Sequence, residues 1–248
     1  MADALRAGGR LLYVGAGTSG RLGVLDASEC PPTFGVSPQQ VQAVIAGGRR
    51  AMTRAVEGAE DDAEAGAASV AGLPVGPQDV VCGISASART PFVLGALEEA
   101  RRRGARTVLV CCNPPGPRLK VDHVLLAETG PELVAGSTRL KAGTATKLIL
   151  NALTTAAFVA LGKVYRGRMV DVRPTNAKLR ERAARMVAEL TDLTPEASKR
   201  LLEEAGGEVK IALAMHFTGL EAKEAKRRLK TTTLRDLTRP KRKRGNDT

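Results

Sequence analysis

Aromatic residues are scarce in this 248-residue chain, where they make up 2% of the sequence, and tryptophan is absent. Proteins that bind single-stranded nucleic acid stack the bases on aromatic side chains, so this scarcity argues against that function. There are only two histidines, His123 and His216, and no H-x-x-H, H-E-x-x-H or Cys/His cluster. Zinc sites use those ligand spacings, so the sequence predicts no metal site and structural roles for both histidines.

The four cysteines have no C-x-x-C spacing of the kind that marks redox or zinc motifs. Cys82, Cys111 and Cys112 stand in apolar, strand-like runs and are expected to be buried free thiols, while Cys30 precedes two prolines. A signal peptide and an apolar run long enough to cross a membrane are also missing. We therefore expect a protein of the reducing cytoplasm without a membrane partner.

Positive charge is in excess, with a formal net charge of +12, and it is unevenly distributed. Dense basic runs occupy residues 101–103, 226–228 and 239–244. We interpret these runs as solvated helix faces and a basic, disordered tail, and the positive field would help to capture an anionic substrate. A nucleic-acid-binding regulator that uses the tail is the weaker alternative.

The first chemically informative motif follows the apolar run of residues 10–14. It is the loop Gly-Ala-Gly-Thr-Ser-Gly-Arg of residues 15–21, and a helical pattern comes directly after it. In such a turn, backbone N–H groups and hydroxyls converge at the positive end of a helix, which favours phosphate binding. The candidate ligands are Thr18 and Ser19. We interpret the loop as neither a dinucleotide-binding loop nor a P-loop, which ends in G-K-[ST], and therefore as a site for a phosphorylated metabolite rather than a nucleotide.

Two further hydroxyl-rich loops precede predicted helices. Ser85, Ser87 and Thr90 follow a strand-like run and stand before a proline-initiated helix, so they can surround a phosphate together with the first loop. Helix capping is the structural alternative, because Ser and Thr often serve as N-caps. The third loop, residues 137–144, begins with Ser137 and offers a hydroxyl and two cations to a phosphate or oxyanion.

Apolar runs alternate with helical patterns along the first two thirds of the chain. Continuous apolar strands that alternate with helices are typical of a parallel sheet covered on both faces. We predict an α/β fold with a doubly wound parallel sheet, whose ligands bind at the carboxyl ends of the strands. The predicted strands are 11–14, 41–46, 80–84, 107–111 and 123–126, and the predicted helices are 51–70, 91–103 and 144–163.

The composition changes after about residue 171. A helical pattern covers residues 177–190, and residues 194–229 contain two or three short amphipathic helices, of which one starts at Thr194-Pro195. Gly206-Gly207 and Gly219 are predicted helix breaks. We predict a sugar-phosphate-binding domain over 1–180, a small helical domain over 181–235 with a packing role, and a basic disordered tail over 236–248.

Several carboxylates are candidates for acid–base chemistry. A Cys-Pro-Pro run follows Glu29, and a proline pair is expected to stop the helix and leave Glu29 at an irregular edge near the first loop. Glu57, Glu60 and Asp61 share one face if residues 51–70 are helical. Acidic residues near a helix start are more often dipole partners than catalysts, so local sequence does not choose among them.

Five stretches of the chain, in this order, resemble the N-acetylmuramic acid 6-phosphate etherases, members of the sugar isomerase (SIS) superfamily. The resemblance extends from about residue 10 to 229, and the blocks ECPPTFG and STRLKAGT are long and specific. The matching stretches are residues 13–35, 55–62, 85–97, 136–151 and 163–179.

The resemblance implies cleavage of the ether that links D-lactate to C3 of the sugar, giving N-acetylglucosamine 6-phosphate and D-lactate. Opening of the sugar ring to an aldehyde acidifies the C2 proton; a base removes it, lactate leaves from C3, and water adds back. By resemblance, Glu29 is the acid and Glu60 is the base. The resemblance implies no cofactor and no metal, and it implies a homodimer with the site near the subunit interface. The phosphate contacts that the resemblance implies are Ser19, Ser85, Ser87 and Thr90, with Ser137 as a further candidate, and Thr18 is a candidate from the loop pattern alone.

Two departures from the family pattern keep other functions open. Only nine residues precede Arg10, where family members usually carry several tens, and Ala88 stands where glycine is usual. Ala88 adds a Cβ where a close approach or a positive φ is required, so we expect somewhat weaker phosphate binding. The alternative is a catalytically silent sugar-phosphate sensor like the glucokinase regulatory protein. A sugar-phosphate isomerase would share the fold, but the two specific blocks favour the etherase.

Overall fold

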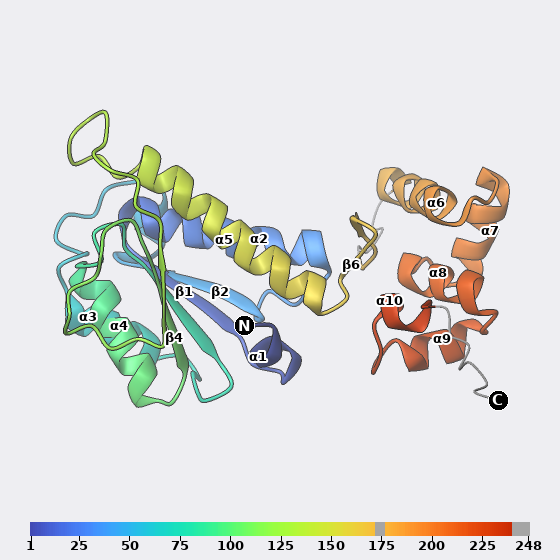
Figure 1. Cartoon of the computed structure of the whole chain (residues 1–248), viewed down its shortest axis with the longest axis horizontal. Helices are drawn as coiled ribbons and strands as arrows, with labels where there is room; N and C mark the ends of the chain where they lie inside the picture. The colour runs from blue at the N-terminus through green and yellow to red at the C-terminus, as the bar shows by residue number, and fades with distance from the viewer. Residues whose placement is uncertain (172–176, 240–248) are drawn as a thin grey trace, which may run out of the picture. The chain divides into compact units, whose positions relative to one another are not determined.

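The computed structural model describes residues 1–171 and 177–239 (Figure 1). The chain forms two compact units: one comprises Met1–Pro31 and Val36–Ala157, the other Pro32–Gly35 and Phe158–Thr248. The expected boundary at residue 180 falls inside the second unit. Of the expected tail, residues 240–248 lie outside the described part, whereas residues 236 and 237 belong to a short helix.

The centre of the first unit is a five-stranded parallel sheet with the order β2-β1-β3-β4-β5, which confirms the predicted doubly wound fold. The strand order reverses at β1, and open α/β sheets bind ligands at the carboxyl edge of such a switch point. Gly15, the last residue of β1, pairs with Ile84, the last residue of β3, so the loops after these strands begin level with each other. The strands are β1 Leu11–Gly15, β2 Val41–Ile45, β3 Val80–Ile84, β4 Arg106–Cys111 and β5 His123–Leu126.

Helices cover both faces of the sheet (Figure 1). Val14 and Val81 point to one face and pack with α4 in a common apolar core. Tyr13 and Ile84 point to the opposite face, where they lie against Gly23 of α2. Burial on both faces explains why β1 and β3 are apolar throughout. The helices of this unit are α1 Ala2–Arg6, α2 Gly17–Phe34, α3 Ala63–Ala71, α4 Pro91–Arg102 and α5 Lys141–Ala160, with a 3₁₀ turn η1 Gly48–Met52.

The predicted helix over residues 51–70 is confirmed only from residue 63 onward and is wrong for the acidic segment before it. The chain forms η1, then turns through residues 53–62, and only then begins α3. Gly58 has a φ of +71°, which interrupts a helix, and the Asp62 carboxylate accepts the N–H of Ala65 at 2.8 Å as the N-cap of α3. The helix therefore starts after the acidic segment instead of containing it.

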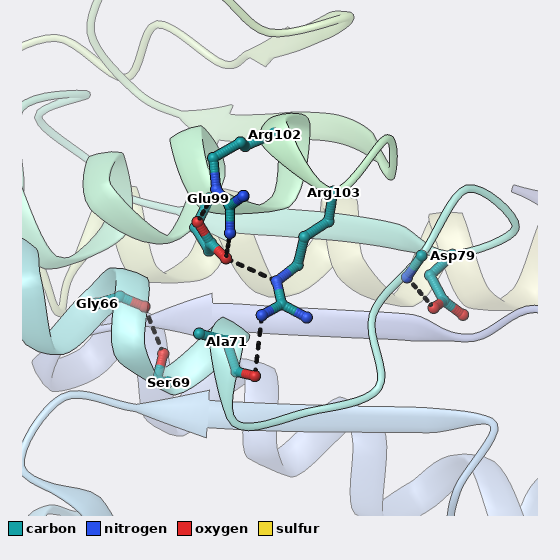
Figure 2. Close-up of polar contacts among 8 residues, drawn as sticks. Gly66, Ser69, Ala71, Asp79, Glu99, Arg102 and Arg103 are labelled. Carbon is teal, nitrogen blue, oxygen red and sulfur yellow. Dashed lines mark hydrogen bonds and ion pairs between the residues drawn. The ribbon is translucent and has the colours of Figure 1, made fainter.

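Helices α3 and α4 pack with their backbones unusually close. A Cβ built on Gly66 of α3 would lie 2.0 Å from the carbonyl oxygen of Phe92, and one on Gly95 of α4 would lie 2.1 Å from that of Ala63. Figure 2 shows the polar contacts at this pair: Arg103, the residue after α4, donates to the carbonyl of Ala71, the last residue of α3, at 3.1 Å. Arg102 and Arg103 both bind Glu99 and lower the pKa of that carboxyl to about 2.

The four cysteines are free thiols with buried side chains, as predicted for three of them. Burial raises the pKa of Cys30 and of Cys82 to about 12, with a contribution from the nearby Asp26 carboxylate. These thiols are therefore packing residues, because the reactive form of cysteine is the thiolate.

The second unit is helical, as predicted, and its starts and breaks follow the expected residues. Thr194 caps α7 by accepting the N–H of Ala197 at 3.3 Å, and Gly219 ends α8 in a left-handed conformation with a φ of +70°. Within the described residues, no helix is long and apolar enough to cross a membrane. The elements are β6 Val164–Tyr165, β7 Arg168–Met169, α6 Ala177–Thr191, α7 Pro195–Glu204, α8 Val209–Thr218, α9 Ala222–Arg228 and α10 Leu234–Leu237.

Candidate functional site

The first polar loop joins β1 to the N-terminus of α2. Gly17, with a φ of +51°, begins the helix, so Thr18 and Ser19 lie in its first turn, where backbone N–H groups have no partner within the helix. Gly15 and Gly20 touch: a Cβ on Gly15 would lie 2.7 Å from the nitrogen of Gly20. The chain therefore turns tightly from strand to helix and presents an anion-binding helix end at the carboxyl edge of the sheet.

The glycines of this loop, Gly15, Gly17 and Gly20, also have the G-x-G-x-x-G spacing of dinucleotide-binding loops. Glycine spacing therefore does not exclude a dinucleotide. The second strand bears on this question, because dinucleotide folds place an acidic residue at its end to bind the ribose. Strand β2 is instead followed by Ala-Gly-Gly-Arg-Arg at residues 46–50, which contains no acid.

The second polar loop joins β3 to α4 and consists of hydroxyls that bind one another. Ser85 is buried, and its Oγ lies 2.8 Å from Thr90 Oγ1 and 3.4 Å from Ser87 Oγ. Thr90 occupies the N-cap position of α4, yet its side chain makes no capping hydrogen bond. The capping alternative therefore does not account for this hydroxyl. Ala88 adopts a φ of +57°, which confirms the expected positive φ at a position where glycine is favoured.

The third polar loop ends at the first turn of α5, which contacts the first loop. A Cβ on Gly143 would lie 3.3 Å from the carbonyl oxygen of Thr138 and 3.6 Å from Cγ2 of Thr18. Helix α5 begins at Lys141, three residues before its predicted start, so Ser137 lies just outside the helix. The structure therefore brings the first and third loops together at the carboxyl edge.

Cys112 connects the second loop to the same turn. Its backbone N–H donates to the carbonyl of Ala86 at 3.0 Å, and its Sγ lies 3.7 Å from the carbonyl oxygen of Ala142, the second residue of α5. Ala86, Cys112 and Ala142 form a small buried apolar cluster. The first turn of α5 is thus the point at which the three loops meet, and the sequence contained no signal for the role of Cys112.

Glu60 lies beside the second loop, although in a turn and not on a helix. Its carbonyl accepts the N–H of Phe92, the second residue of α4, at 3.0 Å, and its side chain is exposed. Glu57 and Asp61 occupy the same turn segment, so the predicted common helical face of the three carboxylates is wrong. Glu60 is the member of this group whose backbone is joined to the helix that follows Thr90.

Glu29 does not lie near the first loop in this chain, contrary to our expectation. The proline pair does not stop the helix: α2 continues to Phe34, and Gly35, with a φ of +64°, follows its last residue. Glu29 is therefore an exposed helical residue, and twelve residues separate it from the start of α2, which is about 18 Å along the helix axis.

A buried carboxylate, which no local sequence motif marks, fixes α2 against the sheet and α5. Asp26 accepts hydrogen bonds from Tyr13 Oη of β1 at 2.9 Å, from Asn151 Nδ2 of α5 at 2.7 Å and from Thr154 Oγ1 at 3.3 Å. Burial and the neighbouring Asp26 raise the pKa of Tyr13 well above its usual value. The partners are 13 and 125 to 128 residues away in sequence, so local pattern could not identify them.

A groove of about 740 Å³ lies beside the second loop, between α4 and residues 116–120. Four of its lining residues are cationic and one is acidic. The four cations form no ion pair with a described residue. The groove therefore adds positive potential near the loops. A larger cavity of about 1070 Å³ belongs to the second unit, and no residue of the three loops lines it. The cations of the groove are Arg89, Arg101, Arg118 and Lys120.

Comparisons with known proteins identify a matching family model and similar bacterial proteins. Residues 1–101 match the family model of the glucokinase regulatory protein N-terminal SIS domain. An N-acetylmuramic acid 6-phosphate etherase from Rubrobacter xylanophilus is 56% identical over 235 residues, which cover 94% of this chain and 78% of that protein.

Further comparisons include another bacterial relative and a solved structure. N-acetylmuramic acid 6-phosphate etherase 2 from Vibrio cholerae is 52% identical over 91% of this chain and 74% of that protein. The solved structure of phosphoheptose isomerase GmhA from Neisseria gonorrhoeae matches with a TM-score of 0.46 and 20% identity, covering 63% of this chain and 81% of that chain. The identities with the two etherases establish that the chain belongs to the N-acetylmuramic acid 6-phosphate etherase family.

Proposed function

We propose that this protein is a carbon–oxygen lyase that cleaves the D-lactyl ether of N-acetylmuramic acid 6-phosphate. The observation that carries the proposal is the meeting of three hydroxyl-bearing loops at the first turn of α5, in a chain that is 52% to 58% identical to etherases. Two of these loops lead into the N-termini of α2 and α4, which favour a phosphate dianion. The phosphate ligands in this proposal are Thr18, Ser19, Ser85, Ser87, Thr90 and Ser137.

Glu60 is the proposed base and Glu29 the proposed acid. With the sugar open as an aldehyde, Glu60 takes the C2 proton, and the electron pair forms the C2–C3 double bond as the C3–O bond breaks. Glu29 gives a proton to the departing lactate oxygen. Water then adds to C3 of the unsaturated aldehyde and a proton returns to C2, which yields N-acetylglucosamine 6-phosphate and D-lactate.

The position of Glu29 supports a homodimer in which each site takes this acid from the second copy. Glu29 lies about 18 Å along α2 from the first loop of its own chain. Leu25, one helical turn before Glu29 and on the same face, is 49% exposed, and Leu148 of α5 is 61% exposed. Apolar residues exposed beside a functional carboxylate suit a subunit contact. We also place the protein in the cytoplasm, where four free thiols stay reduced.

Release of D-lactate from N-acetylmuramic acid 6-phosphate, coupled to a lactate dehydrogenase, tests the activity. We expect release by the parent chain and a loss of about 100-fold or more in Glu60→Gln, the size of a general-base contribution. Glu57→Gln is the matched control, because it removes the same charge from the same turn, and it should retain activity. If the parent releases no lactate while the sugar phosphate still raises its Tm, the protein is a sensor and the proposal is rejected.

Mixing two inactive variants tests the origin of Glu29. If Glu29 and Glu60 of one site come from different copies, refolding a mixture of Glu29→Gln and Glu60→Gln gives hybrid dimers with one intact site. About a quarter of all sites then recover activity, since half of the dimers are hybrids. A mixture that stays inactive, although hybrid dimers are detected, contradicts the shared site.

A further inference from the structure

Glu132 makes a contact that the proposed mechanism does not use. Its carboxylate accepts the backbone N–H of Lys141 at 3.0 Å and that of Ala142 at 2.9 Å, the first two residues of α5. These hydrogen bonds, together with the charge of Lys141, lower the pKa of Glu132. A carboxylate that accepts from a helix N-terminus is a charge-assisted contact of the stronger kind.

The segment that contains Glu132 has few other attachments. Within residues 130–139, the Glu132 carboxylate makes the only hydrogen bonds to other described residues; the bond from Ser137 N–H to Val134 is internal to the segment. The neighbouring Leu133 is 93% exposed and Val134 is 59% exposed, so apolar packing does not hold the segment either. Its position therefore depends on Glu132.

The attachment point is the first turn of α5, where the three polar loops meet. The backbone N–H of Ala142 donates to the Glu132 carboxylate, and the carbonyl oxygen of Ala142 accepts from Sγ of Cys112, which is bonded to the second loop. Gly143, the next residue, lies against Thr18 of the first loop. A displacement of Glu132 would therefore move Ser137 and loosen the junction between all three loops.

We propose that Glu132 is a positioning residue for the phosphate site. Its carboxylate clamps the third loop to α5, so that Ser137 faces the same anion as the first and second loops. It also occupies the two leading N–H groups of α5, which leaves the helix ends of α2 and α4 for the substrate phosphate. The inference rests on the proposed function, since it concerns the same site.

A purely stabilising cap is the competing explanation, and it makes different predictions. A cap affects the Tm alone. A positioning residue also affects the Michaelis constant of the sugar phosphate, because a ligand displaced by about 1 Å costs on the order of tenfold to a hundredfold in kcat/KM. For the same reason, loss of the carboxylate weakens the binding of inorganic phosphate at the three loops.

The experiment compares Glu132→Ala and the milder Glu132→Gln with the parent and with Glu128→Gln. Glu128 lies two residues before the segment, and its carboxylate forms no hydrogen bond or ion pair with a described residue of α5. We expect KM for N-acetylmuramic acid 6-phosphate to rise about tenfold or more in Glu132→Ala, with a smaller fall in kcat. Inorganic phosphate should raise the Tm of Glu132→Ala by less than it raises that of the parent, and Glu128→Gln should match the parent in both respects.

The proposal is overturned if both Glu132 variants keep the KM and the phosphate-induced Tm shift of the parent, whatever happens to their basal Tm. If Glu132→Ala does not fold, Glu132→Gln decides by the same two readouts, because its amide can still accept one of the N–H groups. Absence of lactate release from the parent rejects the proposed function instead. In that case the phosphate-induced Tm shifts still decide the role of Glu132.

Discussion

The close approach of α3 and α4 predicts a measurable cost for a single methyl group. In Gly95→Ala the new Cβ would lie 2.1 Å from the carbonyl oxygen of Ala63 and 2.9 Å from its carbonyl carbon. Ordinary contact begins near 3.4 Å, so the two backbones must separate by about 1 Å. Such overpacking typically costs ~1–3 kcal/mol, and alanine recovers ~1 kcal/mol over glycine in a helix.

Because the clash is with backbone and not with a flexible side chain, we expect a net loss of about 1–2 kcal/mol in the free energy of unfolding. A domain of this size then melts about 3–6 °C lower. The activity should fall as well, because the N–H of Phe92 in α4 donates to the carbonyl of Glu60, which lies in the turn that precedes α3. Separation of the helices moves Glu60 relative to the second loop, and we expect kcat/KM for lactate release to fall about tenfold or more.

Thermal and urea unfolding, with lactate release measured in parallel, provide the assay. Gly72→Ala is the matched control: its Cβ would meet only the carbonyl oxygen of Ala68, at an ordinary 3.5 Å, and its φ of −73° suits alanine. The control should melt at or slightly above the parent. The packing argument is refuted if Gly95→Ala melts as high as Gly72→Ala.

Two further predictions concern Ala88 and Asp79. Ala88→Gly should change the free energy of unfolding by less than about 1 kcal/mol, because relief of the left-handed φ is offset by the greater flexibility of the unfolded chain. It should also lower KM for the sugar phosphate, and an unchanged or higher KM would contradict the assigned effect of the methyl group. Burial raises the pKa of Asp79, but hydrogen bonds from Arg10 and Gly76 outweigh it, and the pKa lies below its usual value. Asp79→Asn should therefore cost about 2–3 kcal/mol at pH 7. Urea unfolding measures this loss of stability at several pH values. The loss is fully present above the pKa of Asp79 in the unfolded chain, about 4, and shrinks as the pH falls through the pKa of Asp79 in the folded protein. A loss that does not depend on pH would contradict the ion pair with Arg10.

Much of the fold could be predicted from local pattern. The five strands and the long helices follow from apolar runs and their spacing, and each predicted strand overlaps an observed one. Thr194 begins α7 as its N-cap, and Gly219 ends α8 in a left-handed conformation, as the chemistry of each residue requires. The hydroxyl loops were also recognisable, because a turn between a buried strand and a helix end leaves its N–H groups and hydroxyls together. Such features depend on neighbours in sequence.

Local rules failed where a distant contact outweighed them. The proline pair after Glu29 was expected to end α2, but the helix continues to Phe34, whose ring stacks on that of Phe158 with centroids 4.6 Å apart. The acidic segment around Glu60 looked helical, but it turns and binds the second residue of α4. Tertiary packing can override propensities of about 1 kcal/mol per residue, since one buried contact is worth as much.

The sequence by itself determined the chemistry available to this protein: the carboxylates, the hydroxyl loops, the parallel sheet and the family. The tertiary structure alone decided which of these groups meet. It placed the three loops around one helix turn, separated Glu29 from them, and introduced Asp26, Cys112 and Glu132, whose partners lie 9 to 128 residues away. The physical reason is that strand and helix patterns are set by neighbours along the chain, whereas a site is set by the edge of a sheet at which distant segments converge.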